Sequence, residues 1–167
     1  MVGGPLRHRL AVETADAAGT RALARALGER LARASAGGVL LLEGPLGAGK
    51  TVFVQGVAAG LGVTTSVKSP TFALEHRHVG RKALHHLDLY RLSPGAGLDE
   101  LGLDELMAGP DVVAIEWPDR LPSIPPDAVQ VVIGWPDGAD PASDRRSIRL
   151  EGPAILLDGL TAGEVHA

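Results

Sequence analysis

The octet GPLGAGKT, from Gly44 to Thr51, decides how this chain folds. It directly follows the apolar run VLLL at residues 39–42, which is typical of a strand buried on both faces of a parallel sheet. Glycine at the first and sixth positions, followed by lysine and threonine, is the spacing of a phosphate-binding loop. The octet therefore predicts a nucleoside triphosphate held where a central strand turns into a helix.

Each position of the octet meets a physical need of a bound triphosphate. Its glycines reach backbone angles closed to other residues, so successive N–H groups can turn inward onto phosphate oxygens. Lys50 supplies a positive charge for the β- and γ-phosphates, and Thr51 supplies a hydroxyl ligand for Mg²⁺. The helix that follows adds the positive end of its dipole. The nucleotide is expected to contact Leu46, Gly47, Ala48, Gly49, Lys50, Thr51 and Val52.

Size and composition limit the class of protein. A chain of 167 residues forms one domain, which we assign to residues 1–151, with residues 152–167 as a loosely held tail. Aromatic residues make up only 3%, so the core is expected to be aliphatic. The absence of cysteine excludes disulfides and thiolate metal sites.

The charge pattern argues against direct binding of nucleic acid. The net charge is −4 and the basic residues are scattered, whereas proteins that bind RNA or DNA through its phosphates usually carry a basic patch. Residues 1–15 carry charges where a signal peptide needs an apolar stretch, and no apolar run approaches membrane-spanning length. The expected location is cytoplasmic, without a membrane partner.

Hydrophobic periodicity predicts a mixture of strands and helices. Strands are expected at residues 6–12, 39–43, 71–79, 82–88, 111–116, 128–134 and 147–150, the last at a sheet edge. Helices are expected at residues 14–34, 50–61 and 98–107. This order predicts an α/β fold, a P-loop NTPase-type three-layer sandwich whose mixed, mainly parallel sheet contains an antiparallel hairpin insertion.

A triphosphate site also needs acids, which P-loop folds place at the carboxyl ends of buried strands. Glu116 ends the apolar run VVAI, in the form of a Walker B segment, and Asp88 ends the less apolar run LHHL. One acid would hold Mg²⁺ and the other would orient the attacking nucleophile. The alternative is that both are surface carboxylates that follow a strand. The presence of Lys50 and Thr51 in the same chain makes this alternative weaker.

Two further segments have alternative interpretations. Ser69 and Thr71 flank Pro70 where a switch segment would reach the γ-phosphate, but the same residues also suit an ordinary Ser/Pro turn. Trp117 follows Glu116 and is either an anchor at the rim of the core or a stacking surface beside the nucleotide.

The histidines raise the question of a metal site. His76 and His78, and likewise His86 and Asp88, have i, i+2 spacing, which places both members of each pair on one face of a strand. Solvated or core-edge histidines are favoured over a transition-metal site. Arg91 follows a strand, and for this arginine a surface ion pair is favoured over a role at the transition state.

Four motifs together resemble the TsaE (YjeE-type) family. In chain order they are the octet at residues 44–51, SPTF at residues 69–72, HLDLYRL at residues 86–92 and IEWP at residues 115–118. The loop alone is moderately specific, whereas the combination is highly specific and spans most of the chain. The sequence departs from the family's pattern after Phe72, where a frequent tyrosine is missing, and past Leu150, where no pattern matches.

The resemblance implies a bacterial ATPase required for the threonylcarbamoyl modification of the adenosine beside the tRNA anticodon. It implies ATP and Mg²⁺ as cofactors. The implied partners are the threonylcarbamoyl transferase and that enzyme's paralogous dimer partner, with tRNA reached only through their complex. In such a family, ATP hydrolysis resets the complex between rounds and does not carry the transferred group.

The resemblance also implies a role for each motif residue. Lys50 and Thr51 would hold phosphates and Mg²⁺. Glu116 would be the second acid associated with Mg²⁺, and Asp88 would position water or metal. The switch would be lined by Ser69 and Thr71.

Hydrolysis by the chain alone is expected to be slow, because no residue is a convincing built-in arginine finger. Two other functions remain open at this point. One is a nucleotide-gated binding module in which hydrolysis is incidental. The other is a small-molecule P-loop kinase, for which neither an Arg-rich lid nor an acceptor pocket is evident in the sequence.

Overall fold

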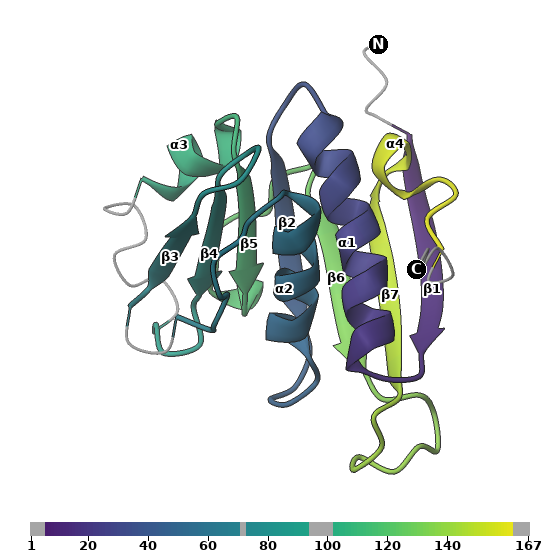
Figure 1. The fold of residues 1–167 in the computed structure, drawn as a ribbon. Helices are drawn as coiled ribbons and strands as arrows, with labels where there is room; N and C mark the ends of the chain where they lie inside the picture. Colours follow the sequence, from purple (N-terminus) through teal and green to yellow (C-terminus); the bar gives the residue numbers. More distant parts are fainter. Residues whose placement is uncertain (1–5, 71–72, 94–101, 162–167) are drawn as a thin grey trace.

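The computed structural model describes residues 6–70, 73–93 and 102–161, which form one seven-stranded sheet with flanking helices (Figure 1). Its strands are β1 (Arg7–Thr14), β2 (Gly38–Glu43), β3 (Glu75–His78), β4 (Leu84–Asp88), β5 (Val112–Glu116), β6 (Val129–Gly134) and β7 (Arg146–Pro153). Its helices are α1 (Ala17–Arg33), α2 (Lys50–Gly60), α3 (Leu103–Ala108) and α4 (Ala154–Leu157), with the 3-10 helix η2 (Pro118–Arg120). The strand order is β1-β7-β6-β2-β5-β4-β3.

The sheet is mixed, as predicted. β4, β5, β2 and β6 run parallel through its centre, and β3, β7 and β1 pair antiparallel with their neighbours. The predicted hairpin is confirmed, because β3 pairs with β4 across a short turn. The last strand, however, is not at an edge. β7 lies between β6 and β1, with Leu150 opposite Leu10, so the edge belongs to β1.

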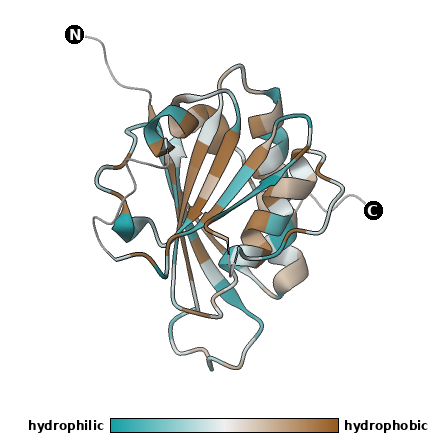
Figure 2. Ribbon diagram, turned by 90° about the vertical axis from the view of Figure 1, so that its left-hand side faces the viewer, coloured by the Kyte–Doolittle hydropathy of each residue, from teal (hydrophilic) through white to brown (hydrophobic). Residues whose placement is uncertain are grey.

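Helices α1 and α2 lie side by side over one face of the sheet (Figure 1). Asp16 begins α1 by accepting a hydrogen bond from the Gly19 N–H at 2.8 Å, as N-cap residues do. Leu23, Leu27 and Leu31 are fully buried, which matches the helix face that their spacing predicts. Hydrophobic residues are concentrated along the strands (Figure 2), and the core is largely aliphatic, as the composition predicts.

The opposite face of the sheet is only half covered. α3 packs over the central strands, where Leu103 joins Leu41, Leu87 and Ile115 in a second core cluster. Residues of β6, β7 and β1 line an open hollow of about 480 Å³, and no helix within the described ranges covers it. The predicted three-layer arrangement therefore holds over β2, β5 and β4. Over β6, β7 and β1 the described residues form only two layers, the sheet and α1, so the prediction is wrong for this part of the described structure.

Residues 152–160 pack against the domain, so the expectation of a loosely held tail is wrong for them. Leu157 is fully buried and Leu160 is 3% exposed. The Arg30 guanidinium donates to two backbone carbonyls of this segment, at 3.0 and 2.6 Å. Leu157 and Leu160 thus pack beside α1. Residue composition alone does not indicate such a short apolar pattern. Residues 162–167 lie outside the described part of the chain.

Two expected elements extend beyond the described residues. The strand expected at residues 71–79 is β3, which begins at Glu75, and residues 71–72 are not described. The helix expected at residues 98–107 corresponds to α3, which begins at Leu103. Among the described helices, none combines the length and the apolar character that crossing a membrane requires.

Candidate nucleotide-binding site

The loop of residues 44–51 joins the end of β2 to the start of α2. Gly47 and Gly49 have φ angles of 79° and 105°, in the left-handed region that side chains disfavour. The Ala48 N–H donates to the Pro45 carbonyl at 3.1 Å, which closes a turn inside the loop. The backbone therefore curls over the N-terminus of α2, where the helix dipole is positive.

Lys50 places its ammonium group inside this loop. Its Nζ donates to the Gly44 and Pro45 carbonyls at 2.7 and 3.0 Å, and only 5% of the residue is exposed. Burial lowers the pKa of Lys50, and the negative charges of Glu116 and Asp88 oppose that shift. The loop thus holds a cation that its own neutral carbonyls and two nearby acids stabilise.

Thr51 and Glu116 meet beside the loop. The Thr51 hydroxyl donates to Oε1 of Glu116 at 3.1 Å. Glu116 ends β5, which pairs in parallel with β2 so that Leu42 lies opposite Glu116. Only 4% of Glu116 is exposed. The apolar run VVAI predicted an acid at the end of a strand beside the loop, and Glu116 lies there.

Asp88 lies on the next strand, opposite Glu116 in the register between β4 and β5. Its carboxylate accepts hydrogen bonds from Ser69 Oγ and from the Tyr90 N–H, both at 3.0 Å. The bond from Ser69 brings the expected switch segment to the acid. Thr71, the other expected switch residue, lies outside the described residues.

Trp117 contacts both the loop and the core. The packing against the core fits an anchor at the rim of the core, and the stacking beside a nucleotide stays a prediction. Its centroid lies 4.4 Å from Lys50 Nζ, and the Tyr90 ring packs on it at 4.9 Å. The same side chain packs against the second core cluster. Trp117 has a φ of 61°, a left-handed conformation that is unusual for a residue with a side chain. Tyr90, which the sequence did not single out, joins the site through this ring pair.

His86 is a second residue that the sequence analysis did not assign to the site. Its Nε2 lies 2.8 Å from Glu116 Oε1, and the imidazole is fully buried. The i, i+2 spacing with Asp88 was the available signal, because it places both side chains on one face of β4. The neighbouring His85 contacts Asp111 instead, at 3.2 Å. Within the described residues, no group of three histidines or acids is placed to hold a metal ion.

Most of the expected site residues line one hollow of about 320 Å³. The lining consists of Leu46, Gly47, Gly49, Lys50, Thr51, Val52, Ser69, Asp88, Tyr90, Glu116 and Trp117. Of the expected nucleotide contacts, Ala48 is fully buried and does not belong to this lining. Residues that are far apart in the sequence are therefore brought together around the glycine-rich loop.

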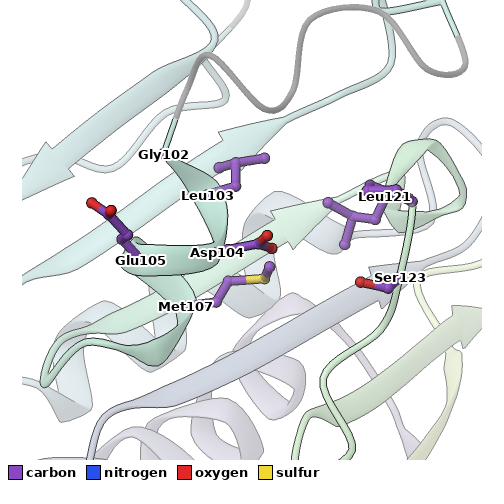
Figure 3. A pocket seen from close by; sticks show the side chains of 8 residues that line it. Gly102, Leu103, Asp104, Glu105, Met107, Leu121 and Ser123 are labelled. Carbon is purple, nitrogen blue, oxygen red and sulfur yellow. The ribbon is translucent and has the colours of Figure 1, made fainter.

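A third hollow, of about 220 Å³, lies between α3 and residues 121–123 (Figure 3). Asp104 and Glu105 belong to its wall, although the Glu105 side chain points away from Leu121 and Ser123. The described residues that line it include no cationic side chain. A phosphate group would meet carboxylates there, so this hollow does not suit a nucleotide.

The geometry defines a mixed α/β protein in which a glycine-rich loop, a buried lysine and two strand-end acids share one end of the sheet. The family model described as "Threonylcarbamoyl adenosine biosynthesis protein TsaE" matches residues 14–146. The chain belongs to this family, whose members take part in the biosynthesis of tRNA threonylcarbamoyladenosine. The resemblance carried by the four motifs is thereby confirmed.

Individual relatives agree with the family model. A protein from Nostoc sp. named "tRNA threonylcarbamoyladenosine biosynthesis protein TsaE" is 45% identical over 128 residues, which cover 74% of this chain and 76% of the relative. The protein of the same name from Bacillus subtilis is 43% identical over 102 residues, which cover 60% of this chain and 63% of the relative. The crystal structure of Bacillus subtilis YdiB has a TM-score of 0.71 and 33% identity, covering 90% of this chain and 89% of that chain.

Proposed function

We propose that this chain is a P-loop NTPase that binds and hydrolyses ATP with Mg²⁺. Its hydrolysis would support the threonylcarbamoyl modification of the adenosine beside the tRNA anticodon. The observation that carries the proposal is the convergence of Lys50, Thr51, Asp88 and Glu116 on one hollow beside the glycine-rich loop. Together they supply the cation, the hydroxyl and the two acids that phosphoryl transfer to water uses.

The loop and Lys50 fit a triphosphate. The ammonium of Lys50 is held by two neutral carbonyls, at 2.7 and 3.0 Å. Hydrogen bonds to charged oxygens are stronger than those to neutral ones, so phosphate oxygens compete well for this donor. The N-terminus of α2 adds backbone N–H groups and a positive dipole end. Lys50 is therefore assigned to the β- and γ-phosphates.

The oxygen atoms beside the loop fit Mg²⁺. Thr51 Oγ1 and Glu116 Oε1 lie 3.1 Å apart, and Asp88 is opposite Glu116 on the adjacent strand. Hydroxyl and carboxylate oxygens are the hard ligands that Mg²⁺ takes, usually together with several waters. When bound, Mg²⁺ would neutralise part of the phosphate charge.

The two acids divide the remaining work. Glu116 is buried and shares its Oε1 with Thr51, so it is assigned to the Mg²⁺ coordination sphere. Asp88 is half-buried and is held in place by Ser69 and Tyr90, so it is assigned to orienting the attacking water. A carboxylate fixed by two donors keeps its orientation while its other lone pairs remain available to water.

The site supports a dependence on partner proteins. Of the described residues that line the hollow, none is an arginine. Arginine fingers stabilise transition-state charge and raise hydrolysis by about 10³- to 10⁵-fold in enzymes that use them. We assign the missing stabilisation or alignment to the threonylcarbamoyl transferase and its paralogous dimer partner. tRNA would be reached through that complex, because the chain carries a net charge of −4.

ATP turnover with and without the transferase pair tests the proposal. We expect slow turnover by the chain alone, stimulation of about tenfold or more by the pair, and no turnover by the Lys50→Ala variant. Lys68→Ala, which removes an exposed lysine, is the matched control. Turnover that is fast alone and unchanged by the pair would contradict the proposal.

The variant Glu116→Gln separates hydrolysis from nucleotide-gated binding. We expect it to bind ATP and the partners while failing to support repeated cycles of tRNA modification. If it sustains many cycles, hydrolysis is incidental and the chain acts as a nucleotide-gated binding module instead. Phosphate transfer onto a metabolite, with ATP consumption exceeding phosphate release, would favour a kinase.

A further inference from the structure

Arg146 holds the outer side of the glycine-rich loop. This arginine begins β7, and its Nε donates to the Ala48 carbonyl at 2.8 Å. Its Nη2 lies 3.4 Å from the Gly47 carbonyl. Gly49 belongs to the lining of the candidate hollow, whereas Arg146 does not. The guanidinium therefore contacts the loop from outside the hollow.

This contact fixes the direction of one backbone N–H group. The peptide that joins Ala48 to Gly49 is trans, because none of the described peptide bonds is cis. In a trans peptide the C=O and N–H bonds point in opposite directions. Because the Ala48 carbonyl points out toward Arg146, the Gly49 N–H points the other way, toward the hollow. A donor in this position is oriented for phosphate before any ligand arrives.

The guanidinium is itself held in place. Its Nη1 donates to the Ser143 and Arg145 carbonyls at 2.6 and 2.8 Å. The Trp135 ring lies 5.0 Å from the guanidinium carbon, within cation–π distance. These hydrogen bonds of Arg146 all go to backbone carbonyls, and the planar, forked guanidinium suits several acceptors at once. A lysine in its place would provide a single donor atom on a flexible stem.

We propose that Arg146 is a positioning residue for nucleotide binding, which presets the Ala48–Gly49 peptide so that the Gly49 N–H faces the phosphates. This inference rests on the proposed function. Arg146 lies 98 positions along the chain from Ala48. It would raise the affinity of the loop for the nucleotide without contacting the nucleotide itself. Residues 135–145, which directly precede Arg146, are thereby connected to the phosphate site.

Nucleotide affinity is the first test. We expect Arg146→Met to weaken the Kd for Mg-ATP by about tenfold or more, the effect of losing a charged hydrogen bond that orients the loop. Arg146→Lys should recover only part of the loss. Arg149→Met is the matched control, because Arg149 is an exposed arginine on the same strand and should leave the Kd unchanged. An Arg146→Met protein that binds ATP like the wild type overturns the inference.

The amide spectrum of the nucleotide-free protein is the second test, and it does not depend on ATP binding. We expect the Gly49 amide resonance to shift and its hydrogen exchange to accelerate in Arg146→Met, with no such change in Arg149→Met. An unchanged Gly49 amide overturns the inference even if ATP binding is weaker. A wild-type chain that fails to bind ATP overturns the proposed function, and the amide test then still decides whether Arg146 orients the peptide. If Arg146→Met does not fold, Arg146→Lys takes its place in both tests.

Discussion

His86 Nε2 lies 2.8 Å from Glu116 Oε1, and both side chains are buried. The same carboxylate oxygen accepts the Thr51 hydroxyl at 3.1 Å. The other imidazole nitrogen, Nδ1, is buried and has no hydrogen-bond partner among the described residues. Among the described residues, the His86 side chain therefore bonds only through Nε2, and together with Thr51 it holds Oε1 of Glu116 in place.

Removing this hydrogen bond should impair hydrolysis more than nucleotide binding. For His86→Leu we expect turnover in the presence of the partners to fall by about 10- to 100-fold, the usual effect of losing a group that orients a metal-associated ligand. ATP affinity should change little, because Lys50 and the loop are untouched. His86→Gln should restore part of the activity, since an amide can donate to the carboxylate. Turnover and Kd measured side by side check this.

The control for that experiment lies one residue away on the same strand. His85 faces the other side of β4 and contacts Asp111 at 3.2 Å. His85→Gln should keep wild-type turnover. Equal losses in the His85 and His86 variants would show that the effect is structural and that Glu116 is not positioned by His86.

Trp117 should report nucleotide binding by fluorescence. Lys50 Nζ lies 4.4 Å from its ring centroid, and the ammonium must exchange its carbonyl partners for phosphate when ATP binds. The chain contains only two tryptophans, and the other, Trp135, packs on Arg146 outside the hollow. We expect ATP to change the emission of the wild type and of Trp135→Phe, but not of Trp117→Phe. A response that survives in Trp117→Phe would show that Lys50 does not move against this ring.

The packing of α1 on α2 should be sensitive to one glycine. A Cβ at Gly28 would come within 2.3 Å of the Val57 carbonyl oxygen. Although alanine is the better helix former by about 1 kcal/mol, overpacking of this kind costs about 1–3 kcal/mol or more. We expect Gly28→Ala to lower the free energy of unfolding in urea. Gly134→Ala is the control, because nothing lies within 4 Å of a Cβ there, and its stability should match the wild type. Equal stability of both variants would contradict the close helix contact.

His78 should make the fold sensitive to acid. Burial lowers the pKa of His78, with the nearby His86 and His76 acting in the same direction. The unfolded chain, in which the pKa of histidine is about 6.5, therefore binds more protons than the folded chain in mildly acidic solution. The contribution of neutral, buried His78 to the free energy of unfolding is fully present above the pKa of the unfolded chain. It is lost as the pH falls through the lower pKa of the folded chain. Urea unfolding at pH 7.5 and 5.5 should show a smaller loss for His78→Gln than for the wild type, and an identical loss would contradict the assignment.

Local patterns predicted the parts of the fold that depend on neighbours in sequence. The spacing of Leu23, Leu27 and Leu31 placed a helix correctly, because an amphipathic helix needs only its own period. The glycine octet predicted the loop, and the runs ending at Asp88 and Glu116 predicted two acids beside it, since parallel strands end at one side of a sheet.

Contacts between distant residues could not be predicted in the same way. β1 pairs with β7, which lies more than 130 residues later in the sequence, and neither strand's own sequence indicates which strand it pairs with. Leu157 and Leu160 are buried although their segment is short, and nothing local indicates the surface against which it packs. The bonds from His86 to Glu116 and from Arg146 to the loop depend on side-chain direction across strands, which residue spacing indicates only in part.

The central claim is that the glycine-rich loop and Lys50 bind a nucleoside triphosphate, and calorimetric titration of Mg-ATP tests it most directly. We expect saturable binding to the wild type and to Lys68→Ala, in which only an exposed lysine is lost. Lys50→Ala should bind about tenfold more weakly or worse, because the charged donor inside the loop is gone. Absence of binding to the wild type, or equal affinity of the wild type and Lys50→Ala, would contradict the claim.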